Sequence, residues 1–151
     1  QAVDILSGSK EVKGKIVIIG GGNIGVQTAQ HLGKKGADIT LLEGRRGPAF
    51  EVEQITRKLL VERLKACNVT TLFKCKATAI NRDSVVYIDQ GGKQCELDAD
   101  NIVLALGMET SEGLLVDLKR EGYQTIALEY CPSQRTVYEF MRQGALAARS
   151  I

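Results

Sequence analysis

One short segment limits the possible folds of this chain more than any other: KIVIIGGGNIGVQTA, residues 15–29. Residues 15–20 form a nearly continuous apolar run, which is typical of a strand buried on both faces of a parallel sheet. Residues 23–35 then place apolar or small side chains at helical spacing, and Gly36 is a helix stop signal. A strand, a glycine-rich turn and a helix in this order predict the start of a βαβ unit.

The next elements continue the alternation of strand and helix. Residues 38–43 (DITLLE) predict a second strand, and the short link before it fits a right-handed crossover. Residues 68–73 predict a third parallel strand. Between them, residues 51–67 predict an amphipathic helix because their apolar positions recur at helical spacing. These positions are Val52, Ile55, Leu59, Leu60, Leu64 and Cys67.

The pattern changes after residue 75. Residues 76–80, 84–89 and 93–97 are short segments rich in β-forming residues, separated by the turn signals NRD and QGG. They predict an antiparallel meander. Residues 101–105 (NIVLA) then predict a return to a buried parallel strand, followed by a further strand at 124–128 and a last helix at 134–148. The side chains expected to face inward on that helix are Val137, Phe140, Met141 and Ala145.

The glycines of the first turn match the pattern G-x-G-x-x-G at Gly20, Gly22 and Gly25. This pattern is informative only between a strand and a helix, which is its context here. The first glycine permits the sharp turn, the second lets a pyrophosphate approach the backbone, and the third lets helix and strand pack closely. Since a helix N-terminus also offers free N–H groups and a partial positive charge, we expect a dinucleotide ligand here.

Glu43 ends the second predicted strand, about where a carboxylate can meet an adenosine ribose in this fold. The alternative is a strand-end carboxylate in solvent. Arg45 and Arg46 follow, and they leave several interpretations open: contact with a ribose 2′-phosphate, contact with the pyrophosphate, stacking on adenine, or simple solvation of the loop. Because the charge of Glu43 opposes a 2′-phosphate, NAD(H) is favoured over NADP(H).

Composition excludes several other functions. The formal net charge is +2, with 20 basic and 18 acidic residues interspersed, so nothing predicts a nucleic-acid partner. No apolar run approaches the roughly 20 residues that span a bilayer, so no membrane partner is expected. Four dispersed cysteines (Cys67, Cys75, Cys95 and Cys131) and one surface histidine (His31) predict no metal site, and indicate reduced thiols in a cytoplasmic protein.

No catalytic residue is predicted either. The tyrosines have no neighbouring base in the sequence, and the paired acids Glu51 and Glu53 are interpreted as a solvated face. Hydride transfer needs no protein nucleophile, because the nicotinamide supplies the chemistry and the protein supplies its placement. The absence of such a group is therefore compatible with a reductase domain.

Three segments, IIGGGNIGVQTA, LLEGRRG and NIVLALGMET, together resemble the nicotinamide-binding domain of two-dinucleotide flavoproteins. The wider resemblance, over almost the whole chain, is to the C-terminal part of the old-yellow-enzyme-like NADH:flavin oxidoreductases, the group of 2,4-dienoyl-CoA and enoate reductases. It implies an α/β, Rossmann-like FAD/NAD(P)-binding fold: a parallel sheet flanked by helices, with an antiparallel β-meander. Because the chain opens on Gln1, we expect a fragment of a longer flavoprotein. Residues 1–151 would be a single dinucleotide-binding domain, with 14–110 as the NAD-binding core and 111–151 as a C-terminal strand and helix.

The resemblance also implies a set of cofactor-binding residues. They are Gly20, Gly21, Gly22, Asn23, Ile24, Gly25, Gln27, Glu43, Gly44, Arg45, Arg46, Ala105, Leu106 and Gly107. FAD would be held by flavin-binding and barrel domains of the parent protein. Two positions depart from the family: Gln27 stands where a glutamate is common, and Glu129-Tyr130 stand where a Gly-Asp pair usually reaches the flavin.

Three functions stay open on this basis. The first is an NAD(H)-binding domain that positions the nicotinamide for hydride transfer to a flavin held elsewhere in the parent. The second is a non-catalytic NAD-sensing regulatory module, and the third is a domain that binds FAD through the same glycines. A meander directly before the LALG turn favours the first, because a simple regulatory unit continues with further βα elements.

Overall fold

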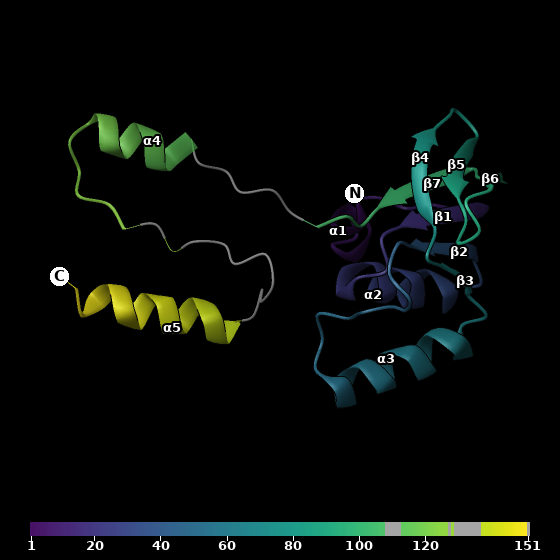
Figure 1. Cartoon of the computed structure of the whole chain (residues 1–151), viewed down its shortest axis with the longest axis horizontal. Coiled ribbons are helices and arrows are strands. Elements are labelled where there is room, and N and C mark those ends of the chain that lie inside the picture. Colours follow the sequence, from purple (N-terminus) through teal and green to yellow (C-terminus); the bar gives the residue numbers. More distant parts are fainter. Residues whose placement is uncertain (108–112, 127, 129–136, 151) are drawn as a thin grey trace. The chain divides into compact units, whose positions relative to one another are not determined.

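A computed structural model describes residues 1–107, 113–126, 128 and 137–150 of the chain (Figure 1). The chain divides into two compact units, residues 1–107 and 108–151. The elements of the first unit, in chain order, are α1 (Ala2–Leu6), β1 (Lys15–Ile19), α2 (Asn23–Gly33), β2 (Asp38–Glu43), α3 (Gln54–Ala66), β3 (Thr70–Phe73), β4 (Lys76–Ile80), β5 (Ser84–Ile88), β6 (Gln94–Asp98) and β7 (Asn101–Leu104).

Four of these strands form a parallel sheet in the order β3-β2-β1-β7. Its central strand is β1, where Ile18 lies opposite Leu41 on one side and Val103 on the other. Strands β4, β5 and β6 form a separate antiparallel sheet. The predicted fold class, a parallel sheet flanked by helices with an antiparallel meander, is confirmed.

The first unit has three layers because the side chains of β1 alternate between two apolar clusters. Ile16 and Ile18 pack with residues of α1, α2 and α3 in one cluster. Val17 and Ile19 pack in the other, which includes Val85 of the antiparallel sheet. Figure 1 shows α2 and α3 on one side of the parallel sheet and β4–β6 on the other. A strand covered on both faces has to be apolar throughout, which explains the run KIVII.

Helix α3 differs from its predicted bounds and pattern. It begins at Gln54, not at residue 51, because the Glu53 carboxylate accepts hydrogen bonds from the N–H of Ile55 (3.0 Å) and Thr56 (3.1 Å) and so caps the helix. Of the apolar positions expected to face the core, Leu60 and Leu64 are buried, whereas Ile55 is 79% exposed. Leu59 is also exposed. The helix therefore contacts the core only through its later turns.

Helix α2 follows its prediction more closely. Its inner face buries three of the four expected side chains, Thr28, Ala29 and Leu32. Ile24 is exposed, contrary to expectation, because it lies in the first turn of the helix, beside the glycine turn. The short helix α1 was not predicted; it buries Ala2 and Ile5 against the same apolar cluster.

The second unit contains α4 (Gly113–Arg120) and α5 (Val137–Ala148). The predicted strand at 124–128 is wrong for residues 124–126 and 128, which lie outside any strand, and residue 127 is not described. Helix α4 was not predicted. Helix α5 confirms the last predicted helix from residue 137 onward, and residues 134–136 lie outside the described part.

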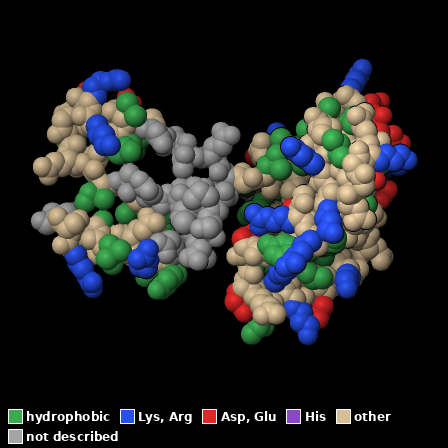
Figure 2. Space-filling model, viewed as in Figure 1, with side chains coloured by type: hydrophobic (Ala, Val, Ile, Leu, Met, Phe, Trp, Pro, Cys, Tyr) green, Lys and Arg blue, Asp and Glu red, His purple; other side chains and the backbone are tan. Residues whose placement is uncertain are grey.

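The expected inward face of α5 is not buried. Phe140, Met141 and Ala145 are all exposed, and the side chain of Val137 lies outside the described residues. The described residues of this unit provide two short helices and no sheet against which these side chains could pack. Figure 2 accordingly shows hydrophobic side chains at its surface. None of the described helices, in either unit, is long and apolar enough to cross a membrane.

Candidate functional site

The glycine turn joins β1 to α2, and two of its glycines are required by close contacts. Gly20 has a φ of +107°, a conformation that favours glycine, and a Cβ on it would lie 2.5 Å from the carbonyl oxygen of Ala105. A Cβ on Gly25 would collide with the carbonyl oxygen of Gly20. The first turn of α2 therefore packs directly on the ends of β1 and β7.

Gly22 differs from these two glycines. It is the N-cap of α2 with an extended backbone, at φ −66° and ψ −179°. A Cβ on Gly22 would meet only the side chain of Glu51, whose Oε1 would lie 2.8 Å away. The fold itself thus leaves space beside Gly22, and a movable side chain lies in that space.

Glu43 lies at the end of β2 and links the glycine turn to the loop that follows β2. Its half-buried carboxylate accepts hydrogen bonds from the N–H of Gly21 (2.6 Å) and of Arg45 (2.7 Å). Because both donors are backbone groups, the position of this carboxylate follows directly from the fold. It is not the freely solvated strand-end group that was considered as an alternative.

The two arginines after Glu43 make contacts within the same loop. A guanidinium nitrogen of Arg45 lies 4.0 Å from the Glu51 carboxylate. The guanidinium of Arg46 lies 5.6 Å from the centre of the Phe50 ring, and that of Arg57 lies 3.7 Å from it. These cation–π contacts tie the loop to α3.

The remaining expected site residues lie around this turn. Asn23 begins α2, and its side-chain oxygen accepts a hydrogen bond from the exposed Gln27 (2.8 Å). At the end of β7, the N–H of Ala105 donates to the carbonyl of Ile19 (2.8 Å). Gly107 has a φ of +107°. Glu129 and Tyr130, where the sequence departs from the family, lie outside the described residues.

A cavity of about 550 Å³ opens beside these groups at the carboxyl ends of the parallel strands. Its lining includes four of the expected residues, Gly20, Glu43, Gly44 and Leu106. Ligands of α/β sheets bind at this edge. The lining also includes residues 76–80 of β4, which the sequence reasoning missed because it followed only the parallel strands. The small residues of the ATA run in β4 were an available signal, since they leave room beside the turn.

The interpretation of Glu51 and Glu53 as a solvated face is wrong. Glu53 caps α3, as described above. Glu51 accepts a hydrogen bond from the N–H of Asn23 and thereby caps α2. Sequence spacing could not show this, because Glu51 reaches a helix that begins 28 residues earlier in the chain.

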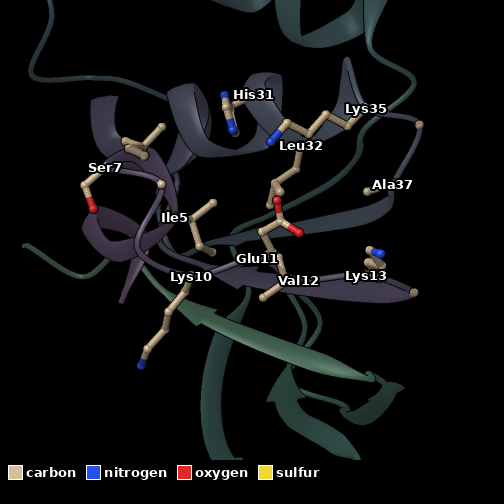
Figure 3. A pocket seen from close by; sticks show the side chains of 14 residues that line it. Ile5, Ser7, Lys10, Glu11, Val12, Lys13, His31, Leu32, Lys35 and Ala37 are labelled. Carbon is tan, nitrogen blue, oxygen red and sulfur yellow. The ribbon is translucent and has the colours of Figure 1, made fainter.

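A second cavity, of about 610 Å³, lies at the opposite edge of the sheet (Figure 3). Its lining comes from α1, from the segment before β1 and from the second half of α2, including Lys13, Lys35 and His31. His31, expected at the surface, is half-buried here. Because Lys13 and Ala37 lie just before β1 and β2, this cavity is at the amino ends of the strands, where α/β sheets do not usually bind ligands.

The cysteines of the described part, Cys67, Cys75 and Cys95, are free thiols. Burial raises the pKa of the Cys75 thiol, so this side chain is protonated at neutral pH. Within the described ranges no three His, Cys, Asp or Glu side chains form a group that could hold a metal ion.

Comparison with known proteins agrees with this geometry. A family model described as pyridine nucleotide-disulphide oxidoreductase matches residues 2–138. The NADH oxidase of Thermoanaerobacter brockii is 32% identical over 109 residues, covering 71% of this chain and 17% of that protein. The bilirubin reductase of Mediterraneibacter gnavus is 29% identical over 145 residues, covering 95% of this chain and 22% of that protein.

Among solved structures, a 2-naphthoyl-CoA reductase in complex with 2-naphthoyl-CoA superposes with a TM-score of 0.76 at 26% identity, covering 94% of this chain and 22% of that one. The chain thus spans about a fifth of the length of these relatives. Since the matched model covers most of the sequence, the protein belongs to the pyridine nucleotide-disulphide oxidoreductase family of flavin- and nicotinamide-dependent oxidoreductases.

Proposed function

We propose that this chain is the NAD(H)-binding domain of a flavin-dependent oxidoreductase. In this role it positions the nicotinamide for hydride transfer to a flavin held by other domains of a longer protein. The observation that carries the proposal is the turn between β1 and α2, where Gly20 and Gly25 are packed against the backbone while Gly22 opens onto space filled only by a side chain. A pyrophosphate needs such an approach to the backbone.

Each part of the turn has a role in this proposal. The N–H groups at the start of α2, from Gly22 to Ile24, would donate to the pyrophosphate, with the helix dipole in support. Glu43 would accept hydrogen bonds from the adenosine ribose, which favours NAD(H) over NADP(H). Ala105, Leu106 and Gly107 would border the nicotinamide half, because they follow β7 at the same edge of the sheet.

The bound dinucleotide would supply the hydride chemistry, and the protein would supply its placement. Leu106 is 72% exposed and lines the cavity together with β4, so it would exclude water from one face of a bound ring. Gln27 presents a neutral polar side chain near the start of α2. No described residue is assigned as an acid or base, because hydride transfer to a flavin needs none from this domain.

The parent protein is proposed to be an NADH:flavin oxidoreductase of the enoate or dienoyl reductase type, acting in the cytoplasm. Matches to an NADH oxidase and a bilirubin reductase support the reductase assignment. The division into an NAD-binding core at 14–110 and a C-terminal part at 111–151 belongs to the same proposal. An NAD-sensing regulatory module is the second candidate, but the meander and these enzyme relatives favour the reductase.

Calorimetric titration with NADH tests the proposal in the purified chain, with Gly22→Val as the variant. The new side chain would displace Glu51 and fill the place of the pyrophosphate. We expect NADH binding to weaken about tenfold or more, because hydrogen bonds to charged groups are each worth about 1.5–3 kcal/mol. The thermal midpoint should change little, since a Cβ at this position meets only a side chain.

Gly113→Val is the matched control, because a Cβ on Gly113 meets nothing within 4 Å and Gly113 lies in α4, outside the site. NADH should bind this variant as it binds the unmodified chain. Equal affinity of Gly22→Val and Gly113→Val would remove the glycine turn from the site. Tighter binding of FAD than of NADH would reassign the ligand.

A further inference from the structure

Glu51 occupies the place on α2 that an anionic ligand would use. Its Oε1 accepts a hydrogen bond from the N–H of Asn23, the first residue of the helix. Its Oε2 lies 4.0 Å from a guanidinium nitrogen of Arg45. A helix N-terminal N–H and an arginine are the two kinds of group that most often bind phosphate in proteins.

The loop that carries Glu51 is anchored beside the glycine turn. The N–H of Ala49 donates to the carbonyl of Gly21 (2.7 Å), and Arg57 stacks on Phe50, the residue before Glu51. The backbone near Glu51 is therefore fixed at both layers it touches, the turn and α3. The position of the carboxylate over the helix end is a consequence of that anchoring.

The Glu51 side chain nevertheless remains free to leave. Its side chain is 39% exposed, and its hydrogen-bond partner is one backbone N–H at the surface. Glu43, by contrast, is half-buried and accepts from two backbone N–H groups. Rotation of Glu51 into solvent would open the space beside Gly22 without disturbing either glycine that packs on the strand ends.

We propose that Glu51 is a built-in competitor of the dinucleotide: its carboxylate holds the pyrophosphate position, and NADH must displace it in order to bind. This inference rests on the proposed function and names the residue that tunes affinity at the same site. Displacement would also pass Arg45 from the carboxylate to the pyrophosphate. Glu51 thus sets how strongly the free protein resists binding, although it contacts no atom of the bound ligand.

The decisive variant is Glu51→Gln, with Glu53→Gln as the matched control. Both remove one negative charge, at positions two residues apart, but Glu53 caps α3 and has no contact with the glycine turn. Glu51→Gln should bind NADH roughly three to ten times more tightly, because a charge at a helix N-terminus and its ion pair are no longer lost on binding. Glu53→Gln should bind NADH as the unmodified chain does.

A thermal scan supplies a readout that a merely structural role of Glu51 would not combine with tighter binding. The midpoint of Glu51→Gln without nucleotide should fall by about 2–5 °C, because the lost contact exists only in the unbound protein. ADP carries the pyrophosphate but no nicotinamide, and its affinity should rise by the same factor as that of NADH. A gain for NADH without a gain for ADP would overturn the competitor role.

The outcomes separate this inference from the function on which it rests. If none of the three proteins binds NADH, the proposed function fails. If the unmodified chain binds NADH and Glu51→Gln binds it equally or more weakly, the proposed function stands and the competitor role is overturned. Weaker binding would make Glu51 a ligand of the dinucleotide instead.

Discussion

Glu43 is the single residue whose charge should decide between the two nicotinamide dinucleotides. Its carboxylate is fixed by the N–H groups of Gly21 and Arg45, so a ribose 2′-phosphate would have to sit near an immobile negative charge. NADH should therefore bind about tenfold more tightly than NADPH, and Glu43→Gln should reduce that gap to about threefold or less. Calorimetric titration of both nucleotides into both proteins measures the gap.

Asp38→Asn is the control for this comparison, because it removes a charge from the same strand at its other end. It should leave the gap between the two nucleotides unchanged. If NADPH binds the unmodified chain more tightly than NADH, the arginines after β2 decide the specificity, although Arg46 is stacked on Phe50 in the structure.

Single residues also show where sequence reasoning reached its limit. The requirement for glycine at positions 20 and 25 could be predicted, because a strand, a tight turn and a helix leave no room there for a Cβ. The role of Glu51 could not, because it depends on how a loop folds back over a helix 28 residues earlier. Local patterns identify the groups that a turn requires, and only the tertiary structure shows which side chain fills the remaining space.

Among the elements, helix α3 is the one whose start depends on pH. The N–H groups of Ile55 and Thr56 hold the pKa of the Glu53 carboxyl below its ordinary value of 4.5. A carboxyl with a lowered pKa stabilises the fold above that ordinary value, and the contribution is lost as the pH falls through the lower folded value. Glu53→Gln should therefore destabilise the chain near pH 7, and this difference should vanish near pH 3.

Urea unfolding of both proteins at the two pH values measures this effect through the change in midpoint. Glu62→Gln provides the comparison, since Glu62 is an exposed residue within the same helix and not at its cap. A difference between Glu53→Gln and the unmodified chain that stays constant from pH 7 to pH 3 would contradict the capping role.

The elements of the first unit were predictable to different degrees. The parallel strands could be predicted because strands buried on both faces are apolar throughout, and the meander because its turns carry NRD and QGG. Helix α3 was placed too early because a carboxylate cap is not visible in apolar spacing. The segment 124–128 has the composition of a strand, but strand formation also requires a neighbouring edge, which sequence alone does not show.

At the scale of the whole chain, we expect binding without turnover. The 151 residues contain a single G-x-G-x-x-G motif, and hydride transfer requires an acceptor held within roughly 3–3.5 Å of the nicotinamide carbon. A partial flavin site makes too few contacts to offset the entropy lost on binding. The purified chain should therefore bind NADH, be colourless, and not accelerate NADH oxidation when FAD is added.

Absorbance at the flavin and NADH bands measures both parts of this prediction. The matched control is the Gly22→Val variant, which should give the same background rate of NADH oxidation. A yellow preparation with one FAD per chain would contradict it, as would NADH oxidation by the unmodified chain that Gly22→Val abolishes.

The order β3-β2-β1-β7 has a consequence for how the chain is made. Strand β1 pairs with β2 soon after it is synthesised, but its other edge waits for β7, more than 80 residues later. Contacts so distant in sequence form slowly, since the intervening chain must first be ordered. Until Asn101–Leu104 leaves the ribosome, Ile16–Ile19 exposes an unpaired apolar edge, the kind of surface on which nascent chains aggregate or recruit chaperones.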